Sequence, residues 1–379
     1  MKIAIIAPLV TAIREPQRGG SQAFVSDLAR GLTRRGHDVH VYAASGSEIP
    51  EAKVIDTGID PESLAATLYR ASGPATPDPA TPDPSTPAPA TPDPAVAEAA
   101  FATAYAGVRG ARYDVIHNHA FDAPAITLAA ELDAPVVHTL HLPPDQAVAA
   151  ALRYAEQCGK PPVVAAVSDF QARAWRRVAR VDAILPPLVP TGSIAWSRSP
   201  GAGAVFAGRL SPEKGAAEAI DIARAAGIAI DVYGDPYDAG YARERIGPRE
   251  GQPGVAVHRA VPRASLWAAM ARAVVVLYPA GWDEPFGMAA AEAQACGTPV
   301  VAFRRGALGE VISDGLTGFL VPPGDLRAAV GAVGRVAGIS RLACRRHAEA
   351  RLDLARSLDA HERLYRRVAG QGTGAQASA

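Results

Sequence analysis

The sequence predicts an α/β protein with two doubly wound, Rossmann-like domains. Short apolar runs alternate with helical stretches along most of the chain, which is typical of stacked βαβ units whose parallel sheets are covered on both faces. This alternation stops in a loop rich in proline and glycine between residues 186 and 203, and then starts again. The length of 379 residues also exceeds one average domain, since about 150 residues per domain gives two or three.

The break in the alternation sets the expected domain boundaries. We expect a first domain over residues 1–187, a linker near 187–202 and a second domain over 203–340. Leucines among arginines and acids predict a C-terminal helix over residues 341–367 that packs back on the body, followed by a disordered tail up to residue 379. The expected strands lie at residues 3–7, 39–43, 115–117, 135–140 and 163–167 in the first domain, and at 204–207, 228–233, 255–258, 274–278 and 299–302 in the second.

Residues 73–95 interrupt the first domain with near-tandem TPDPA repeats. Proline at this density cannot supply the hydrogen bonds of a helix or a strand ladder, so we expect an extended, solvated loop. The composition favours an inert insertion, and docking of a partner is the alternative.

The composition argues against several classes of function. The 38 basic and 38 acidic residues balance, which gives no reason to expect nucleic acid as a partner. No apolar run approaches the roughly 20 residues that span a bilayer, and the N-terminus runs into a strand without a signal-peptide cleavage region, so we expect a cytoplasmic protein. The basic C-terminal helix leaves weak peripheral membrane contact as an alternative to packing on the body. Cys158, Cys296 and Cys344 are widely spaced without a CxxC pair, which argues against a zinc site or a disulfide framework.

Two glutamates near residue 290 bracket a predicted helix start. Glu284 lies in the loop before the helix and Glu292 within it, because residues 285–287 can end a loop and the alanine-rich residues 288–295 favour a helix. A helix start directs unpaired N–H groups and a partial positive charge at one point, which suits an anionic ligand. Carboxylates accept hydrogen bonds from hydroxyl groups. The pattern indicates a site for a nucleotide sugar, and two surface glutamates without a ligand are the alternative.

A second motif, AGRLSPEKG, begins at the end of a predicted strand. Arg209 and Lys214 lie in this turn, at the carboxyl end of the strand, where open α/β sheets bind their ligands. Arginine offers a planar fork and lysine a point charge, and together they can neutralise a diphosphate. Lys214 is one of only four lysines in the chain, so a lysine at this turn is less expected to be an ordinary surface residue without a function.

Gly19 and Gly20 come well after the first predicted strand and just before a predicted helix. This is not the GxGxxG spacing of a dinucleotide-binding fold, which argues against a dehydrogenase. Paired glycines let the backbone approach a phosphate or an acceptor closely, and a flexible loop without a contact is the alternative.

Histidines occur at the ends of two neighbouring predicted strands. His117, Asn118 and His119 stand at the end of one strand, and His138 and His141 stand at the end of the next. Because the carboxyl ends of parallel strands meet at one edge of a sheet, we expect these side chains to converge on one crevice. As metal ligands they lack a convincing third partner. Hydrogen bonding to a sugar, or packing under the crevice, is favoured.

In their order and spacing, these segments resemble the retaining glycosyltransferases of family 4, which have the GT-B fold of two Rossmann-like domains facing across a cleft. The resemblance covers nearly the whole chain and is greatest to the short actinobacterial enzymes that tailor natural products or cell-surface glycans. It implies that the first domain binds an acceptor and the second a nucleotide sugar. The segments that carry it are GGSQAFVSDLARGLTRRGHDVHVYA, YDVIHNH, HTLH, GRLSPEKG, DEPFGMAAAEAQACGTPVVA and DGLTGFLVPPGD.

The resemblance implies how the second domain holds the donor. Arg209 and Lys214 would bind the diphosphate, and Glu292 would hold the ribose hydroxyls. Glu284 would hold the transferred sugar together with backbone N–H groups. Those N–H groups belong to Phe286, Gly287 and Met288.

For the first domain, the resemblance implies that His119 lies against the anomeric carbon of the donor. Gly20 would lie near the diphosphate, and the acceptor-side candidates are Gly19, Gly20 and His141. The TPDPA insertion departs from the family pattern, as does Gln22, where many relatives are expected to have an acidic residue. Both departures concern the acceptor side.

The chemistry implied by the resemblance is sugar transfer without a metal ion or other cofactor. Breaking a sugar–phosphate bond places positive charge on the anomeric carbon and negative charge on the diphosphate, which cationic side chains and helix N–H groups can stabilise. No persuasive DxD motif indicates a metal in the regions expected to be structured. Attack by an acceptor hydroxyl on the face that the phosphate leaves would retain the anomeric configuration. The residues expected to take part are His119, Glu284, Arg209 and Lys214.

Other functions remain open on this two-domain frame. A nucleotide-sugar epimerase and a glycogen-type phosphorylase are alternative enzymes, but a phosphorylase needs a lysine for pyridoxal phosphate and Lys214 is the only lysine of the second domain. A catalytically silent nucleotide-sugar binder that partners another transferase is the alternative outside enzymes. The sequence does not identify the nucleotide base, the sugar, the acceptor or the oligomeric state.

Overall fold

The computed structural model describes residues 1–69, 94–199 and 201–376. In this part of the chain, the sheet of the first domain has the strand order β3-β2-β1-β4-β5-β6-β7, with neighbouring strands parallel. Its strands are β1 (Lys2–Ile6), β2 (Asp38–Ala43), β3 (Lys53–Asp56), β4 (Val115–Asn118), β5 (Val136–Leu140), β6 (Val163–Ala166) and β7 (Ala183–Ile184). Its helices are α1 (Gly20–Arg34), α2 (Pro61–Tyr69), α3 (Pro94–Arg109), α4 (Ala123–Thr127), α5 (Gln146–Gln157) and α6 (Asp169–Trp175).

The second domain repeats this plan around a sheet whose order, over the same described residues, is β10-β9-β8-β11-β12-β13. Its strands are β8 (Ala204–Ala207), β9 (Ile230–Tyr233), β10 (Val255–His258), β11 (Val275–Tyr278), β12 (Val300–Phe303) and β13 (Gly318–Val321). Its helices are α7 (Ala216–Ala225), α8 (Ala239–Tyr241), α9 (Arg263–Arg272), α10 (Met288–Ala295), α11 (Leu308–Val311) and α12 (Leu326–Val333), and α13 (Arg341–His347) and α14 (Leu354–Gln376) follow. Short 3₁₀ or π turns lie at Leu128–Glu131, Thr191–Ser193, Pro212–Lys214, Ala242–Ile246, Val336–Gly338 and Ala348–Leu352.

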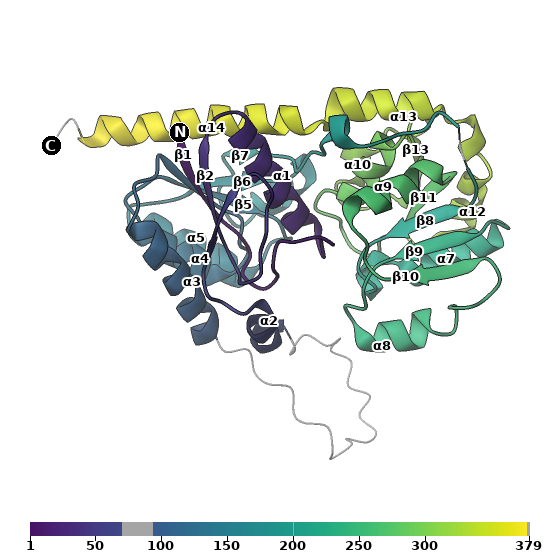
Figure 1. Ribbon diagram of the computed structural model, residues 1–379, viewed down its shortest axis with the longest axis horizontal. Coiled ribbons are helices and arrows are strands. Elements are labelled where there is room, and N and C mark those ends of the chain that lie inside the picture. The colour runs from purple at the N-terminus through teal and green to yellow at the C-terminus, as the bar shows by residue number, and fades with distance from the viewer. Residues whose placement is uncertain (70–93, 200, 377–379) are drawn as a thin grey trace, which may run out of the picture.

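The two domains lie side by side, each with helices on both faces of its sheet (Figure 1). This arrangement confirms the predicted α/β class with two Rossmann-like domains. Every strand that the sequence predicted is present, but β3, β7 and β13 were missed. All three are edge strands. No residue of β3 or β7 is fully buried, so their apolar signal is weak, whereas most of β13 is buried and only its short length of four residues explains why it was missed.

Strand β1 shows how the first domain is held together. Its buried side chains alternate between the two faces of the sheet, as the pleat requires. Ile3 and Ile5 pack on the side of α1, in a cluster that also includes residues of α14. Ala4 and Ile6 belong to the cluster on the opposite side, which includes residues of α3. Such two-sided burial explains why this strand reads as a continuous apolar run.

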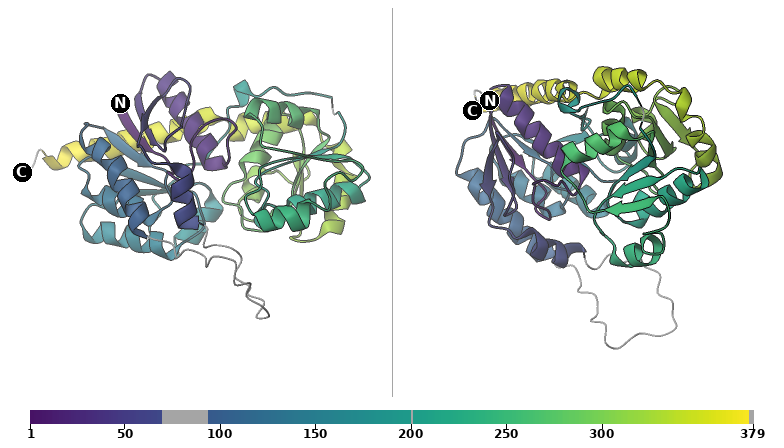
Figure 2. Two further views of the ribbon diagram at one scale, coloured as in Figure 1. Left: turned by 60° about the horizontal axis from the view of Figure 1, so that its bottom comes forward. Right: turned by 45° about the vertical axis from the view of Figure 1, so that its right-hand side comes forward.

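The C-terminal segment differs from the single helix that we expected over residues 341–367. The structure has two helices, α13 and α14, with a break at Asp353, whose backbone is extended (φ −73°, ψ 134°). Val189 of the linker stabilises this break. Its N–H donates to the carbonyl of Leu352, and its carbonyl accepts from the N–H of Leu354, each at 2.8 Å. Beyond the break, α14 leaves the second domain and runs along the first (Figures 1 and 2).

Helix α14 is bound to the first domain by apolar contacts with α1. Leu358, Leu364 and Tyr365 belong to the same core cluster as the inner face of α1. Gly31 of α1 makes room for this contact, because a Cβ atom there would lie 2.7 Å from Leu358 Cδ1. The helix extends to Gln376, further than predicted, and the expected tail beyond it lies outside the described residues. The TPDPA insertion also lies outside them, except that its last residues, 94 and 95, begin α3.

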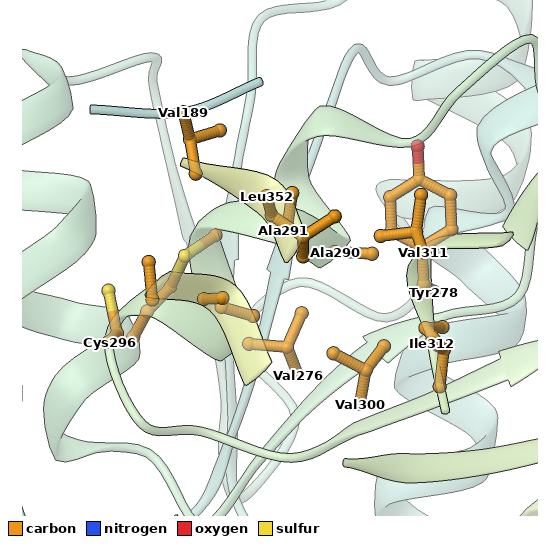
Figure 3. Packing of buried hydrophobic residues seen from close by; sticks show 14 of the residues in the cluster. Val189, Val276, Tyr278, Ala290, Ala291, Cys296, Val300, Val311, Ile312 and Leu352 are labelled. Atoms are coloured by element: carbon orange, nitrogen blue, oxygen red, sulfur yellow. The ribbon is translucent and has the colours of Figure 1, made fainter. Parts of the chain in front are cut away.

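Helix α10 is fixed by close packing on the second sheet. Ala290 and Ala291 contact a cluster that includes Val276 of β11 and Val300 of β12 (Figure 3). Their small side chains let the helix backbone approach the sheet closely. Val189 and Leu352 cover the same cluster from the linker and the C-terminal segment (Figure 3). The start of α10 is therefore held at one place, at the carboxyl edge of the sheet.

No helix within the described ranges has both the length and the apolar composition needed to cross a bilayer.

Candidate active site

The strand order of the second sheet reverses between β8 and β11. In open α/β sheets, ligands bind at such a switch point, outside the carboxyl ends of the strands. The loop after β8 contains Arg209 and Lys214, and the loop after β11 contains Glu284. The fold thus brings the two sequence motifs of this domain to one point.

Lys214 and Glu284 form an ion pair at this point. Nζ of Lys214 lies 2.8 Å from Oε2 of Glu284, and the indole Nε1 of Trp282 donates to the same oxygen at 2.8 Å. The ammonium group also lies 4.8 Å from the centre of the Trp282 ring. Gly215 makes this approach possible, because its backbone is left-handed (φ 76°) and a Cβ atom would lie 2.2 Å from the carbonyl oxygen of Pro279.

Arg209 lies at the more open side of the same loop. Its side chain is 34% exposed, and Nη2 lies 3.2 Å from Glu213 Oε1. The guanidinium carbon lies 4.2 Å from the centre of the Tyr237 ring, which holds the planar group flat. The remaining N–H groups of Arg209 can therefore reach a ligand.

The start of α10 has the geometry of an anion site. Gly287 has a left-handed backbone (φ 102°), and a Cβ atom there would lie 2.6 Å from Leu308 Cδ2, so only glycine fits. In the described part of the chain, no group accepts a hydrogen bond from the backbone N–H of Phe286, Gly287 or Met288. These are the N–H groups that the family resemblance assigned to the transferred sugar, and they are free to bind a ligand.

Gly306, which follows β12, is a supporting residue that the sequence analysis missed. Its backbone is left-handed (φ 56°), and a Cβ atom would lie 2.2 Å from the carbonyl oxygen of Glu284. The N–H of Ala307 donates to this same carbonyl at 2.8 Å. The loop after β12 therefore fixes the backbone of Glu284. A glycine after a predicted strand was the available signal, but its contact with Glu284 depends on the sheet order.

Glu292 has a partner that we did not expect. Its Oε1 accepts from Nε of Arg263 at 3.0 Å and from Nη2 at 2.8 Å. Nη1 of Arg263 donates at 2.8 Å to Oδ2 of Asp27, which lies in α1 of the first domain. Sequence reasoning gave no signal for Arg263, which lies outside every recognised segment, and although Asp27 lies in the segment that begins at Gly19, nothing in the sequence indicated a role for its carboxylate.

In the first domain, the strand order reverses between β1 and β4. His119 follows β4, and its backbone N–H donates to the carbonyl of Ile6, at the end of β1. Its Nδ1 lies 3.0 Å from Nε2 of His141, which follows β5. Burial lowers the pKa of both imidazoles, that of His141 to about 4, so both are neutral at pH 7. Nε2 of His119 is buried, and among the described residues it has no hydrogen-bond partner.

His117 and His138 belong to the interior rather than to a ligand-facing edge. His117 contacts the hydroxyl of Tyr365 through Nδ1 at 2.6 Å and that of Thr139 through Nε2 at 2.7 Å. Burial lowers the pKa of His138 to about 3. Asn118 is also buried, and its side chain donates to the carbonyl of Ala125. In the described ranges, no three histidines, cysteines or acids are placed to hold a metal ion.

The paired glycines lie at the boundary between the domains. Gly20 begins α1, and a Cβ atom there would lie 3.4 Å from Sδ of Met288, the first residue of α10. Gly19 is the residue before the helix and adjoins Gln22, because a Cβ atom would lie 2.5 Å from Gln22 Oε1. The starts of α1 and α10 therefore face each other, one from each domain.

A cavity of about 390 Å³ lies between the domains. Its second-domain wall consists of Asp283 and Pro285, the two neighbours of Glu284. Arg209 and Lys214 do not line it. The first-domain wall follows β5 and β6 and consists of Pro143, Pro144, Phe170, Gln171, Arg173, Ala174 and Arg177.

The two walls of this cavity are joined by Glu310 of α11. Its carboxylate accepts hydrogen bonds from the backbone N–H groups of Asp169 at 2.9 Å and Phe170 at 2.6 Å, at the start of α6. On the first-domain side, the carbonyl of Leu142 accepts from Gln171 Nε2 and Trp175 Nε1 at 2.8 and 2.9 Å. The loop after β5 is thereby held against α6.

Both domains match glycosyltransferase families. Residues 200–350 match the family described as glycosyl transferases group 1, and residues 18–192 match glycosyltransferase family 4. A D-inositol 3-phosphate glycosyltransferase of Acidothermus cellulolyticus is 28% identical over 387 residues, which cover 88% of this chain and 82% of the relative.

Solved structures of the same fold cover almost the whole chain. Sucrose-phosphate synthase from Thermosynechococcus elongatus superposes with a TM-score of 0.74 at 19% identity, covering 97% of this chain and 98% of that one. HepE of Anabaena in complex with UDP superposes with a TM-score of 0.68 at 19% identity, covering 95% and 98%. These findings do not favour the epimerase, phosphorylase or silent-binder alternatives. The chain belongs to glycosyltransferase family 4 and has the GT-B fold.

Proposed function

We propose that this glycosyltransferase moves a sugar from a nucleoside diphosphate donor to an acceptor hydroxyl, with retention of the anomeric configuration and without a metal ion. The observation that carries the proposal is the ion pair of Lys214 with Glu284 beside the unpartnered N–H groups that open α10. A cation, a carboxylate and a helix start at one point match a diphosphate joined to a polyhydroxylated sugar. The complex of HepE with UDP supports a nucleotide donor.

The donor diphosphate carries the negative charge that develops as the bond to the sugar breaks. Arg209 and Lys214 neutralise this charge, and the N–H groups at the start of α10 add fixed dipoles that need no reorganisation. Glu284 already accepts hydrogen bonds from Lys214 and Trp282. A carboxylate held in this way serves to bind sugar hydroxyls rather than to attack the anomeric carbon. Glu292 holds the ribose.

The acceptor attacks on the face from which the phosphate departs. The bond between the anomeric carbon and the phosphate oxygen breaks, a bond from the acceptor oxygen to the anomeric carbon forms, and the hydroxyl proton passes to the departing phosphate oxygen. No enzyme nucleophile and no metal ion take part. His119 is neutral, and its unpartnered Nε2 is available for a hydrogen bond to the donor sugar.

The acceptor occupies the cavity between the domains, beside Glu284. Arg173 and Arg177, four positions apart, are the two basic residues that line the first-domain wall of the cavity. Glu310 lies 3.9 Å from Arg173, while Arg177 has no ion pair among the described residues. The relatives named for D-inositol 3-phosphate match an acceptor that carries a phosphate. We therefore infer a phosphorylated polyol as the acceptor class.

The first test is release of nucleoside diphosphate from UDP-, GDP- and dTDP-sugars. We expect slow release from one donor, and D-inositol 3-phosphate should accelerate it. NMR of the first-formed product should show the anomeric configuration of the donor. An inverted linkage contradicts the mechanism. Absence of release from every donor contradicts the enzyme activity and favours a binding protein.

A second test addresses the acceptor cavity. Arg177→Ala should raise the KM for the phosphorylated acceptor by about tenfold, since one charge-assisted contact is lost, and should leave the KM for the donor unchanged. Arg180→Ala is the matched control, because Arg180 pairs with Asp182 at 2.9 Å and does not line the cavity. Equal acceptor KM values for the two variants contradict this location.

A further inference from the structure

A buried ion network links the two domains behind the candidate donor site. Arg263, the first residue of α9, lies between Asp27 of the first domain and Glu292 of the second, and the three residues are 8%, 4% and 6% exposed. Its guanidinium donates to Asp27 at 2.8 Å and to Glu292 at 3.0 and 2.8 Å. Its backbone N–H donates at 3.0 Å to Glu15, also of the first domain.

The geometry of this network fixes the direction of the Glu292 side chain. Both bonds from Arg263 go to Oε1, and within the described residues no donor contacts Oε2. The rigid fork of a guanidinium leaves little freedom to a carboxylate that it binds through two N–H groups. The face of Trp267 lies 4.8 Å from the guanidinium carbon and restricts it further. One oxygen of Glu292 is therefore anchored and the other is left for a ligand.

The same network depends on how the domains are placed. Asp27 lies on α1, two helical turns after Gly20, which faces Met288 at the start of α10. Residues seven positions apart on a helix share one face, so this face of α1 contacts the second domain at both points. Separation of the domains would remove Asp27 from Arg263 and leave the guanidinium with Glu292 alone.

We propose that Arg263 is a positioning residue that orients Glu292 for the donor ribose and makes this orientation depend on Asp27, so that donor binding and domain closure are coupled. The inference rests on the proposed function in one respect, namely that Glu292 holds the ribose. Neither Arg263 nor Asp27 needs to touch the donor. By reciprocity, a nucleotide that binds better when Asp27 is in place must also stabilise the closed arrangement.

The decisive variant is Asp27→Asn, because it changes the nucleotide site from the other domain. We expect the Kd of the nucleoside diphosphate, measured by calorimetry, to rise about tenfold, within the usual range of such couplings. The donor KM should rise in parallel while kcat changes less. Arg263→Met should lose at least as much affinity for the nucleoside diphosphate. Arg263→Lys should lose less than Arg263→Met, because lysine keeps the charge but not the planar fork of the guanidinium.

Two control variants separate this role from ordinary structural support. Arg35→Gln removes another ion pair of the first domain, directly after α1, with Asp359 at 2.7 Å. Arg249→Gln removes one of the second domain, with Asp221 at 2.7 Å. Both should bind nucleotide as the wild type does. Circular dichroism and thermal unfolding show whether each variant is folded. If Asp27→Asn does not fold, Arg263→Lys replaces it as the test variant.

The coupling itself is tested by combining Asp27→Asn with Glu292→Gln. If Asp27 acts through Glu292, the double variant loses much less affinity than the product of the two single losses. Purely multiplicative losses, or wild-type affinity in Asp27→Asn, overturn the inference. A wild-type protein that binds no nucleoside diphosphate overturns the proposed function instead, so the two failures are distinguishable.

Discussion

Nζ of Lys214 lies 2.8 Å from Oε2 of Glu284, although the two residues are 70 positions apart in the chain. The contact joins the loop after β8 to the loop after β11, at the switch point of the second sheet. Both side chains are largely buried, at 16% and 9% exposure. In the proposed function, this cation and this carboxylate face the two halves of one donor, the diphosphate and the sugar.

We expect Lys214→Ala to lower kcat/KM by about 10²- to 10³-fold, because a preorganised charge that stabilises the leaving group is lost. The fold should be retained, since Glu284 still accepts a hydrogen bond from Trp282. Steady-state kinetics and circular dichroism measure the two effects. Lys160→Ala is the control, because this lysine lies at an exposed site near Asp133. A Lys214→Ala enzyme with near wild-type activity would contradict the assignment.

Gly306→Ala should disturb the site through the backbone of Glu284. The new methyl group would overlap the peptide of Glu284, and the left-handed backbone adds about 1 kcal/mol of strain. We expect a lower melting temperature and at least a tenfold lower kcat/KM. Gly309→Ala is a matched control in α11, where a Cβ atom meets nothing within 4 Å and alanine favours the helix. Similar effects in both variants would show that the Glu284 contact is unimportant.

Stability should fall in mild acid because of the buried histidines. Burial holds the pKa of His141 and His361 at about 4 and that of His138 at about 3, below the ordinary value of 6.5. Above pH 6.5 these imidazoles are neutral in both states. Between pH 6.5 and about 4 only the unfolded chain takes up the protons, so each histidine lowers the free energy of unfolding by roughly 1 kcal/mol per pH unit.

Urea unfolding between pH 7.5 and 4.5 measures this slope. His138→Leu should reduce the slope by the contribution of about one proton taken up on unfolding, since both ring nitrogens of His138 lack a partner among the described residues. His258→Gln is the control, because that imidazole is partly exposed beside Asp231. An unchanged slope in His138→Leu would contradict the attribution to burial.

Tyr365→Phe should weaken the attachment of α14 to the first domain. The hydroxyl of Tyr365 contacts His117, whose ring centre lies 4.0 Å from that of His119. Loss of this buried hydrogen bond should cost about 1 kcal/mol or more of unfolding free energy. Chemical denaturation measures the cost, and Tyr154→Phe, at an exposed site, should have no effect. Equal stability of the two variants would argue against the contact.

Removal of metal ions should leave the transfer rate unchanged, because in the proposed mechanism side-chain cations and helix N–H groups supply the charge stabilisation. The measurement is the initial rate after treatment with EDTA, compared with the rate after added Mg²⁺ or Mn²⁺. A rate that is lost with EDTA and restored by one of these ions would contradict a metal-free mechanism.

The sequence by itself determined the fold class and the two motifs of the proposed donor site. Buried parallel strands such as β1 must be apolar on both faces, so they are visible as short runs, and glycine and proline mark where they end. The loop with Arg209 and Lys214 and the helix start with Glu284 were likewise visible, because each is a local pattern of residue types. Only edge strands were missed, and of these β3 and β7 bury less of their surface than an inner strand such as β1.

The tertiary structure alone decided which of these residues meet and what supports them. The contact of Arg263 with Asp27 joins positions 236 apart, and that of His117 with Tyr365 joins positions 248 apart. Nothing in the local periodicity indicates such pairs, because they arise from the order of the strands and from the return of α14 to the first domain. Helix and strand patterns depend on neighbours in the chain, whereas the partner of a buried charge depends on the path of the whole backbone.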